Sequence, residues 1–247
     1  IQAELGEDAL CDVCREFPRL RHDYGDFMEL GLELSCPEAA RLILTAPIAP
    51  AICTAAAGDG QPDYDDADMA LLKQTRTAAL ELLAGHETRE ALALLLLYGA
   101  AAQQGLDTGE MEDFDIPAAL ETGHSLRQRP DMPGFFRFFR ELEILTPRWA
   151  ALLRTPAPLR FPPEMKAFAR YLVERYWLQA ISDFDLMGRV KFIVISCLLV
   201  GSLPGGFAEN AQLFSKEIEN DADNVDAILD AAGTYCPFTD SRLLGSL

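Results

Sequence analysis

Three cysteines near the start of the chain, Cys11, Cys14 and Cys36, have the type and spacing that could do chemistry. Two residues separate Cys11 from Cys14, and at this spacing a tight loop can turn two thiolates toward one metal ion or iron–sulfur cluster, or close a redox disulfide. In a structural alternative, Cys36 is a small buried apolar residue and the pair has no function. Three thiolates do not complete a four-thiolate site, so at least one further ligand would come from elsewhere.

The residues before and after Cys36 predict how it is positioned. Apolar and other residues alternate with a period of two across 27–34, which predicts a short, half-buried extended segment leading to Cys36. Pro37 suits the first position of a helix. Cys36 would therefore be the N-cap, where the helix dipole favours a thiolate and metal binding. His22 lies near these cysteines in sequence and is a candidate neighbour of the site.

Two stretches of the sequence resemble a known family. The run LCDVCREFPR, followed by GDFMELGLELSCPEAARLIL, resembles the segment of the flagellin lysine-N-methylase family in which a paired-cysteine motif leads to an SC-x-E-x-A-R-L helix. Downstream, RYLVERYWLQAISDFDLMGRVKFIVIS and LFSKEIENDADNVDAIL resemble the C-terminal helices of the same family. Residues 55–160 match only in general helical character.

The resemblance implies a specific activity. Members of this family are understood to methylate lysine side chains of flagellin, with S-adenosylmethionine as methyl donor and a cysteine-bound iron–sulfur cluster taking part. By the same resemblance, Cys11, Cys14 and Cys36 occupy positions of cluster cysteines, in a cluster of the 4Fe-4S type. Family members carry a further cysteine-rich segment upstream, and this sequence begins at Ile1 without one. We therefore expect an N-terminally truncated fragment whose cluster is completed by cysteines absent from this chain, and the loss of those cysteines favours an inactive fragment.

Three polar residues set among apolar ones in the C-terminal match are further candidates. Arg175 or Lys191 could hold the carboxylate of the methyl donor, and Glu217 could orient the ammonium group of a substrate lysine. In the structural alternative, these residues form ion pairs at the edges of packed helices. No general base can be named from the sequence.

Composition narrows the classes of partner. The 247 residues carry a formal net charge of −18, which argues against binding to nucleic acid or to an anionic membrane surface and suits a lysine-bearing protein partner. Six scattered cysteines do not form a disulfide scaffold, so a reducing cytoplasm is expected. Cys53, Cys197 and Cys236 are expected to be unreacted thiols. The longest apolar run, 192–200, is too short to cross a bilayer and predicts a buried helix.

The periodicity predicts a mainly α, multi-helix fold with a small cysteine-bearing, partly extended N-terminal segment. Residues 1–54 would form the C-terminal part of a cysteine-rich metal- or cluster-binding segment, and residues 55–247 a helical domain. Proline, glycine and aspartate predict a loop over 45–66. Apolar residues from Phe135 to Leu152 trace one face of a single helix. The other helices are expected at 68–85, 88–104, 116–129, 165–180, 207–219 and 223–232.

Two functions from different classes are compatible with these features. The first is a cytoplasmic, S-adenosylmethionine-dependent protein-lysine N-methyltransferase that acts on flagellin lysines with an iron–sulfur cluster. The second is a non-catalytic interaction module in which a zinc ion staples the N-terminal piece onto the helices. The sequence contains no dinucleotide-binding, phosphate-binding or hydrolase motif. It also lacks the alternation of strands and helices that would predict the usual α/β methyltransferase architecture.

Overall fold

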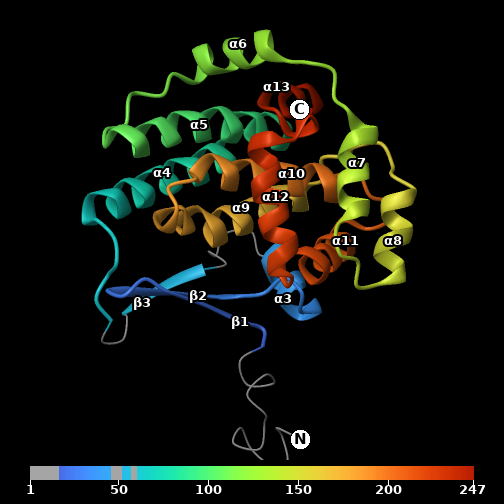
Figure 1. Cartoon of the computed structure of the whole chain (residues 1–247), viewed down its shortest axis with the longest axis horizontal. Helices are drawn as coiled ribbons and strands as arrows, with labels where there is room; N and C mark the ends of the chain where they lie inside the picture. The colour runs from blue at the N-terminus through green and yellow to red at the C-terminus, as the bar shows by residue number, and fades with distance from the viewer. Residues whose placement is uncertain (1–16, 46–51, 57–59) are drawn as a thin grey trace, which may run out of the picture.

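A computed structural model of the chain describes residues 17–45, 52–56 and 60–247. The described part is mainly α-helical, with a small three-stranded sheet near its N-terminal end, as the sequence predicts. Sheet and α3 lie together on one side of the helical body (Figure 1). In the part of the chain that is described, no helix has both the length and the apolarity needed to cross a membrane.

The sheet is an antiparallel meander of β1 (Arg19–Asp23), β2 (Phe27–Leu32) and β3 (Ile52–Ala56), in that order. A tight turn joins β1 to β2, in which the Tyr24 N–H donates to the Phe27 carbonyl oxygen at 2.9 Å. Gly25 supplies the positive φ of 91° that this turn requires, a conformation that side chains disfavour. The extended segment predicted over 27–34 is thus confirmed as β2, which ends two residues earlier than its pattern.

The third strand corrects the loop predicted over 45–66. Ile52, Cys53 and Thr54 pair with Gly31, Leu30 and Glu29 of β2. Isolated from its neighbours, a five-residue segment between prolines and glycines has too few local contacts to be a stable strand. The hydrogen bonds of β2 supply what the local sequence lacks, and for that reason the loop prediction was wrong here.

Helix α3 (Pro37–Thr45) begins where the sequence predicts. Ala40 donates its N–H to the Cys36 carbonyl oxygen at 2.8 Å, which places Cys36 at the N-cap position. Ala39, Ala40, Ile43 and Leu44 form its buried face. This face packs against α9 (Pro163–Tyr176) and α11 (Phe207–Phe214), so the N-terminal segment is fixed to the C-terminal helices.

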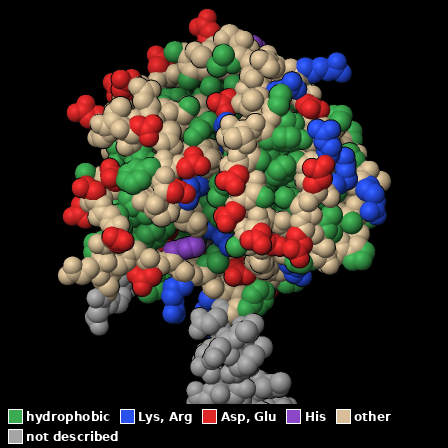
Figure 2. All heavy atoms as spheres, viewed as in Figure 1, with side chains coloured by type: hydrophobic (Ala, Val, Ile, Leu, Met, Phe, Trp, Pro, Cys, Tyr) green, Lys and Arg blue, Asp and Glu red, His purple; other side chains and the backbone are tan. Residues whose placement is uncertain are grey.

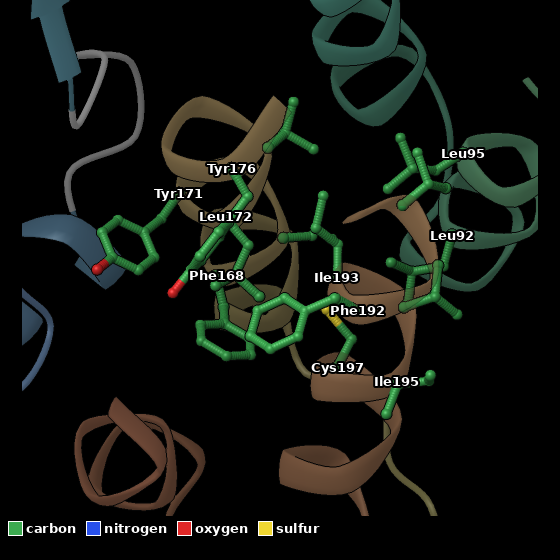
Figure 3. Close-up of a cluster of buried hydrophobic side chains, with 14 of the residues drawn as sticks. Leu92, Leu95, Phe168, Tyr171, Leu172, Tyr176, Phe192, Ile193, Ile195 and Cys197 are labelled. Atoms are coloured by element: carbon green, nitrogen blue, oxygen red, sulfur yellow. The ribbon is translucent and has the colours of Figure 1, made fainter. Parts of the chain in front are cut away.

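The centre of the molecule is apolar and is built around α10 (Leu186–Gly201). This helix lies between α9 and α5 (Thr88–Thr108), and α5 forms a helical hairpin with α4 (Asp66–Gly85). Leu92 and Leu95 of α5 lie on one side of Ile193, and Phe168 and Leu172 of α9 on the other (Figure 3). The run 192–200 is therefore a buried helix, as predicted.

The remaining helices surround this centre. They are α6 (Ile116–Leu126), α7 (Met132–Glu141), α8 (Pro147–Arg154), the 3-10 turn η2 (Trp177–Ser182), the π turn η3 (Ser215–Glu219), α12 (Ala222–Thr234), the 3-10 turn η4 (Cys236–Phe238) and α13 (Asp240–Ser246). Among these described elements, only η4 and α13 had no counterpart among the predicted helices, since η2 and η3 lie at the ends of the helices predicted at 165–180 and 207–219.

The single helix predicted from Phe135 to Leu152 is in fact two helices, α7 and α8. Pro147 cannot continue a helix because it lacks an N–H and its ring clashes with the preceding turn. Thr146 instead starts a new helix, with its hydroxyl accepting from the Trp149 N–H at 3.2 Å. Of the predicted face, Phe135 and Trp149 are in the core, but Leu145 is exposed. Phe139, which lies outside that face, is also in the core.

The expected division after residue 54 does not correspond to two separate cores. Leu20, Phe27 and Leu34 belong to the same continuous buried cluster as the side chains of α5, α9 and α10. Within the described residues, the sheet and α3 therefore share the hydrophobic core of the helical body.

Candidate functional site

Of the three candidate metal ligands, only Cys36 belongs to the described part of the chain. Cys11 and Cys14 lie outside the described residues, so the geometry of the complete thiol set stays a prediction. Cys36 is half-buried at the start of α3 and is not in a disulfide. Within residues 17–45, 52–56 and 60–247, no three His, Cys, Asp or Glu side chains are grouped closely enough to hold a metal ion.

The β1–β2 hairpin closes next to the segment that leads to Cys36. Arg19 pairs with Leu32, and the Glu33 N–H donates to the Pro18 carbonyl oxygen at 2.7 Å. In the sequence, Cys14 precedes Pro18 by four residues and Cys36 follows Glu33 by three. The hairpin thus brings the chain that follows Cys14 back to the segment that precedes Cys36.

The inner face of the sheet is unusually polar. His22 of β1 pairs with Glu29 of β2, and directly paired residues point to the same face of a sheet. Arg76 of α4 donates to Glu29 on that face, and Glu29 is only 1% exposed. Leu30, which points the opposite way, is exposed. The structure therefore buries the face of β2 that carries the glutamate.

A buried ion pair lies on α9 beneath the sheet. Arg175 is 3.1 Å from Oε1 of Glu219 in η3, and its Nη1 donates to the Tyr171 hydroxyl at 2.6 Å. Tyr176 donates to the same Glu219 oxygen at 3.1 Å. Burial by itself would lower the pKa of Arg175, but Glu219 and the two tyrosines outweigh it and raise that pKa, so the guanidinium stays charged. Tyr171 also accepts a hydrogen bond from the backbone of Leu34, two residues before Cys36.

His22 faces this ion pair from the sheet. Burial lowers its pKa, and the positive charge of Arg175 lowers it further, so the imidazole is neutral near pH 7. Its Nε2 atom is buried and has no hydrogen-bond partner. A neutral imidazole nitrogen with a free lone pair can accept a proton.

A second charged pair lies beside the first. Arg76 of α4 donates from Nη1 to Glu29 Oε1 at 2.7 Å and also to the Glu174 carbonyl oxygen at 3.3 Å. Tyr24 stands close to this pair, and burial together with the charge of Glu29 raises the pKa of its hydroxyl, which has no hydrogen-bond partner. We call the eight residues of the two pairs and their neighbours the inner cluster: His22, Tyr24, Glu29, Arg76, Tyr171, Arg175, Tyr176 and Glu219.

A groove of about 870 Å³ opens beside the inner cluster, between the β1–β2 turn and η2. His22 and Tyr24 line it from the sheet, together with Asp23, and Asp63 lines it from the segment before α4. Phe184, on the opposite rim, is 47% exposed and has a φ of 60°, a backbone conformation that bulky residues rarely adopt. Strained backbone and exposed aromatic side chains are features that often accompany binding sites.

The three polar candidates from the C-terminal match are not brought together. Arg175 belongs to the inner cluster. Lys191 donates to the Ala232 carbonyl oxygen at 3.0 Å and is 2.7 Å from Asp240.

Glu217 is completely buried, with its two oxygens accepting from the Leu145 N–H at 2.8 Å and the Thr146 hydroxyl at 2.5 Å. These contacts fix the loop between α7 and α8. Arg175 and Lys191 form ion pairs, as in the structural alternative, whereas Glu217 is held by hydrogen bonds. The ligand roles of all three residues stay predictions.

Sequence patterns missed most of the inner cluster. Glu29 alternates with the apolar residues Met28 and Leu30, and Glu219 lies in the mostly polar run 215–221, so the local pattern marks neither position as buried. Their partners, Arg76 and Arg175, lie 47 and 44 residues away in sequence. The other cysteines are free, as predicted: Cys53 and Cys236 are exposed, and burial raises the pKa of the Cys197 thiol.

Comparison with known proteins identifies no relative: no family model matches the chain, and neither a curated protein nor a solved structure matches it.

Proposed function

We propose that this chain is part of a cytoplasmic, S-adenosylmethionine-dependent protein-lysine N-methyltransferase that acts on flagellin lysines, with an iron–sulfur cluster held by Cys11, Cys14 and Cys36. The observation that carries the proposal is the closure of the β1–β2 hairpin. It brings the sequence neighbours of Cys14 and Cys36 to one end of the sheet, with the hydrogen bond between Glu33 and Pro18 at 2.7 Å. The resemblance of these segments to the flagellin lysine-N-methylase family supplies the activity.

Cys36 is suited to be one of the ligands. Its thiol is half-buried and is not in a disulfide, and it stands at the N-terminus of a nine-residue helix, directly after the segment that follows β2. The short sequence distances from Cys14 to Pro18 and from Glu33 to Cys36 limit how far apart the sulfur atoms can lie. When bound, a cluster of the 4Fe-4S type supplies electron-transfer chemistry at this end of the sheet.

The groove would receive the substrate lysine. Two carboxylates, Asp23 and Asp63, outnumber the one arginine in its lining, Arg21. Tyr24 and Tyr64 supply aromatic surface against which an alkylammonium side chain can pack. The net charge of −18 would also attract a lysine-bearing surface from a distance. This charge distribution suits a cationic polypeptide substrate.

His22 would prepare the lysine for reaction. A lysine ammonium has no lone pair, so it must lose a proton before its nitrogen can take a methyl group. His22 lines the groove, is held neutral by burial and Arg175, and has an unpartnered Nε2 that could take this proton. Arg175 would act as a positioning residue, kept in place by Glu219 and Tyr171.

The test of the cluster uses the chain that carries Cys11, Cys14 and Cys36. Anaerobic visible and EPR spectra with metal analysis are compared for wild type, Cys36→Ser and Cys53→Ser, because Cys53 is an exposed, free cysteine of the same sheet. We expect a brown, iron-containing protein whose signal is lost in Cys36→Ser and kept in Cys53→Ser. Stoichiometric zinc without iron would replace the proposal by the zinc-stapled interaction module, and a metal-free protein would overturn both.

The test of the lysine role measures methyl transfer to flagellin. We expect His22→Gln to keep the cluster spectrum and to lose about 100-fold in rate, the usual scale of a general-base contribution. His124→Gln, the same substitution at an exposed histidine of α6 outside the groove, serves as the control and should retain activity. Equal rates for wild type and His22→Gln would remove the proton-transfer assignment without affecting the cluster.

A further inference from the structure

A basic region interrupts the acidic surface of this protein. Residues 127–160 contain seven arginines against three acidic residues, although the whole chain carries a net charge of −18. Lys and Arg side chains gather along the right-hand edge of the molecule in Figure 2, over α7 and α8, while acidic side chains are scattered over the rest of the face. Positively charged side chains that cluster in a protein of negative net charge create a local positive potential, which favours an anionic ligand at that place.

A cavity of about 660 Å³ lies in this region, between the start of α7, the segment after α8, and the ends of α10 and α13. Its walls are mainly apolar: Pro130, Pro133, Phe136, Pro156, Pro158 and Leu159. Proline fixes its own backbone φ, so walls rich in proline keep their shape without a ligand. The volume falls within the range typical of sites for small molecules.

Inside this cavity, one buried polar group has no partner. Ser202 is 1% exposed and lines the cavity, and its Oγ forms no hydrogen bond. The backbone of the same residue is fully used, since its N–H donates to Leu198 at 3.1 Å and its carbonyl oxygen accepts from Ala157 at 2.8 Å. A buried hydroxyl without a partner carries a free-energy penalty that a ligand atom would remove.

Two arginines complete the lining of the cavity. Arg140 donates one hydrogen bond, to the Leu153 carbonyl oxygen at 3.3 Å. Arg154 forms no ion pair or hydrogen bond within the described ranges, and no acidic side chain described there lines the cavity. The cavity thus combines apolar walls, one hydroxyl and two guanidinium groups, which is the chemistry that recognises a carboxylate on an apolar body.

We propose that this cavity binds a small molecule with one carboxylate and an apolar body, seated with the carboxylate on Arg154 and Arg140 and with a polar atom on the Ser202 hydroxyl. The proposal is independent of the methyl-transfer site. S-Adenosylmethionine does not suit this cavity, because its sulfonium and ammonium groups would face two arginines without a counter-charge.

The test titrates the whole chain with three matched eight-carbon probes, octanoate, 1-octanol and octylamine, by isothermal titration calorimetry. We expect octanoate to bind most tightly, octanol at least tenfold more weakly, and octylamine not at all. Arg154→Gln should weaken octanoate about 10- to 100-fold, as expected for a hydrogen bond between charged groups, and Ser202→Ala about threefold or more.

Arg148→Gln is the matched control, because Arg148 lies on α8 outside the cavity and is exposed. Its octanoate affinity should equal that of wild type. Equal affinity for the three probes, or unchanged octanoate binding in Arg154→Gln, would overturn the proposal. The proposal would also be overturned if the chain bound an acidic peptide at Arg154 and did not bind octanoate.

Discussion

Helix α9 has two faces that differ in chemistry, and the contrast separates what holds this protein together from what it could use for function. Toward α10 and α11, Phe168 packs edge-on against Phe214 with ring centroids 5.7 Å apart. Toward the sheet, the same helix presents Tyr171 and Arg175. Figure 3 shows this difference: Phe168 and Leu172 point to the side chains of α10, whereas the Tyr171 hydroxyl points to the segment drawn in blue.

The apolar face accounts for stability by ordinary means, since each large apolar side chain that leaves water contributes about 1.5–3 kcal/mol. The stability of the protein does not explain why the other face of α9 carries buried charged groups. Buried ion pairs such as Arg175 with Glu219 usually contribute little net stability, because desolvation of the two charges offsets their attraction. Perturbed ionisable groups beside a groove are typical of functional sites, which is why we place the candidate site on this face.

The largest expected effect comes from removing one partner of the buried pair. Glu219→Ala leaves the Arg175 charge buried without compensation, and we expect a loss of about 3–5 kcal/mol in the free energy of unfolding, measured by urea denaturation. The double variant Arg175→Met/Glu219→Leu removes both charges and should recover most of that loss. A double variant as unstable as the single one would mean that the pair itself stabilises the fold.

The apolar side of the comparison is tested by overpacking. Helices α5 and α10 touch closely at Gly99, where an added Cβ would lie 2.6 Å from Cγ1 of Val190. We expect Gly99→Ala to lower the free energy of unfolding by about 1–3 kcal/mol. Gly233→Ala is the matched control, because an added Cβ there meets nothing within 4 Å, and it should stabilise α12 by about 0.5–1 kcal/mol.

The electrostatic coupling between the sheet and α9 gives a smaller, pH-dependent effect. The pKa of His22 is lowered in the folded protein, so folding is favoured by the neutral form. Its contribution is complete above the unfolded pKa of about 6.5 and is lost as the pH falls below that value. Wild type should therefore lose stability below pH 6.5 with a slope of at most about 1.4 kcal/mol per pH unit from this group, and His22→Gln should lack that slope.

An NMR titration of the His22 ring measures the same quantity directly. Its midpoint should lie below 6.5 in wild type and rise in the Arg175→Met/Glu219→Leu variant if that variant keeps its fold. A midpoint at or above 6.5 in wild type would contradict the placement of His22 against Arg175.

The smallest effect is expected where charge is present without burial. Arg148 and Glu209 form a 3.1 Å pair whose side chains are 60% and 73% exposed. Arg148→Ala should change the free energy of unfolding by only a few tenths of a kcal/mol, because water and salt screen such a pair. A loss comparable to that of Glu219→Ala would show that burial is not what distinguishes the inner cluster.

Local sequence predicted the regular elements well. Pro37 after Cys36 predicted the start of α3, and continuous helical periodicity predicted α4, α5 and α10, because these signals depend on residues within a few positions of each other. The predictions failed where a distant contact or a local stop decided the outcome. Helix α8 is separate from α7 because of Thr146 and Pro147, and β3 exists because β2 pairs with it.

The candidate site divides in the same way. The thiols of Cys11, Cys14 and Cys36 and their spacing were evident in the sequence, and the extended segment predicted before Cys36 is present as β2. The hairpin that β2 forms with β1 was not predicted. The inner cluster was not evident, apart from Arg175 and His22 as single candidates. Its pairs join residues 44 and 47 positions apart, and no local pattern specifies which buried cation meets which carboxylate.

The sequence by itself determined the helical class, the extended segment before Cys36 and the position of Cys36 at a helix N-terminus. Only the tertiary structure decided which face of β2 is buried. The alternation favours the apolar face with Met28, Leu30 and Leu32, yet Leu30 is exposed and the opposite face is buried. Packing of α4 and α9 buried the face with Phe27 and Glu29, and this choice placed a carboxylate, His22 and Tyr24 against Arg76 and Arg175. The physical reason is that a face of a strand is buried only where another part of the chain packs on it, and here that part lies far away in the sequence.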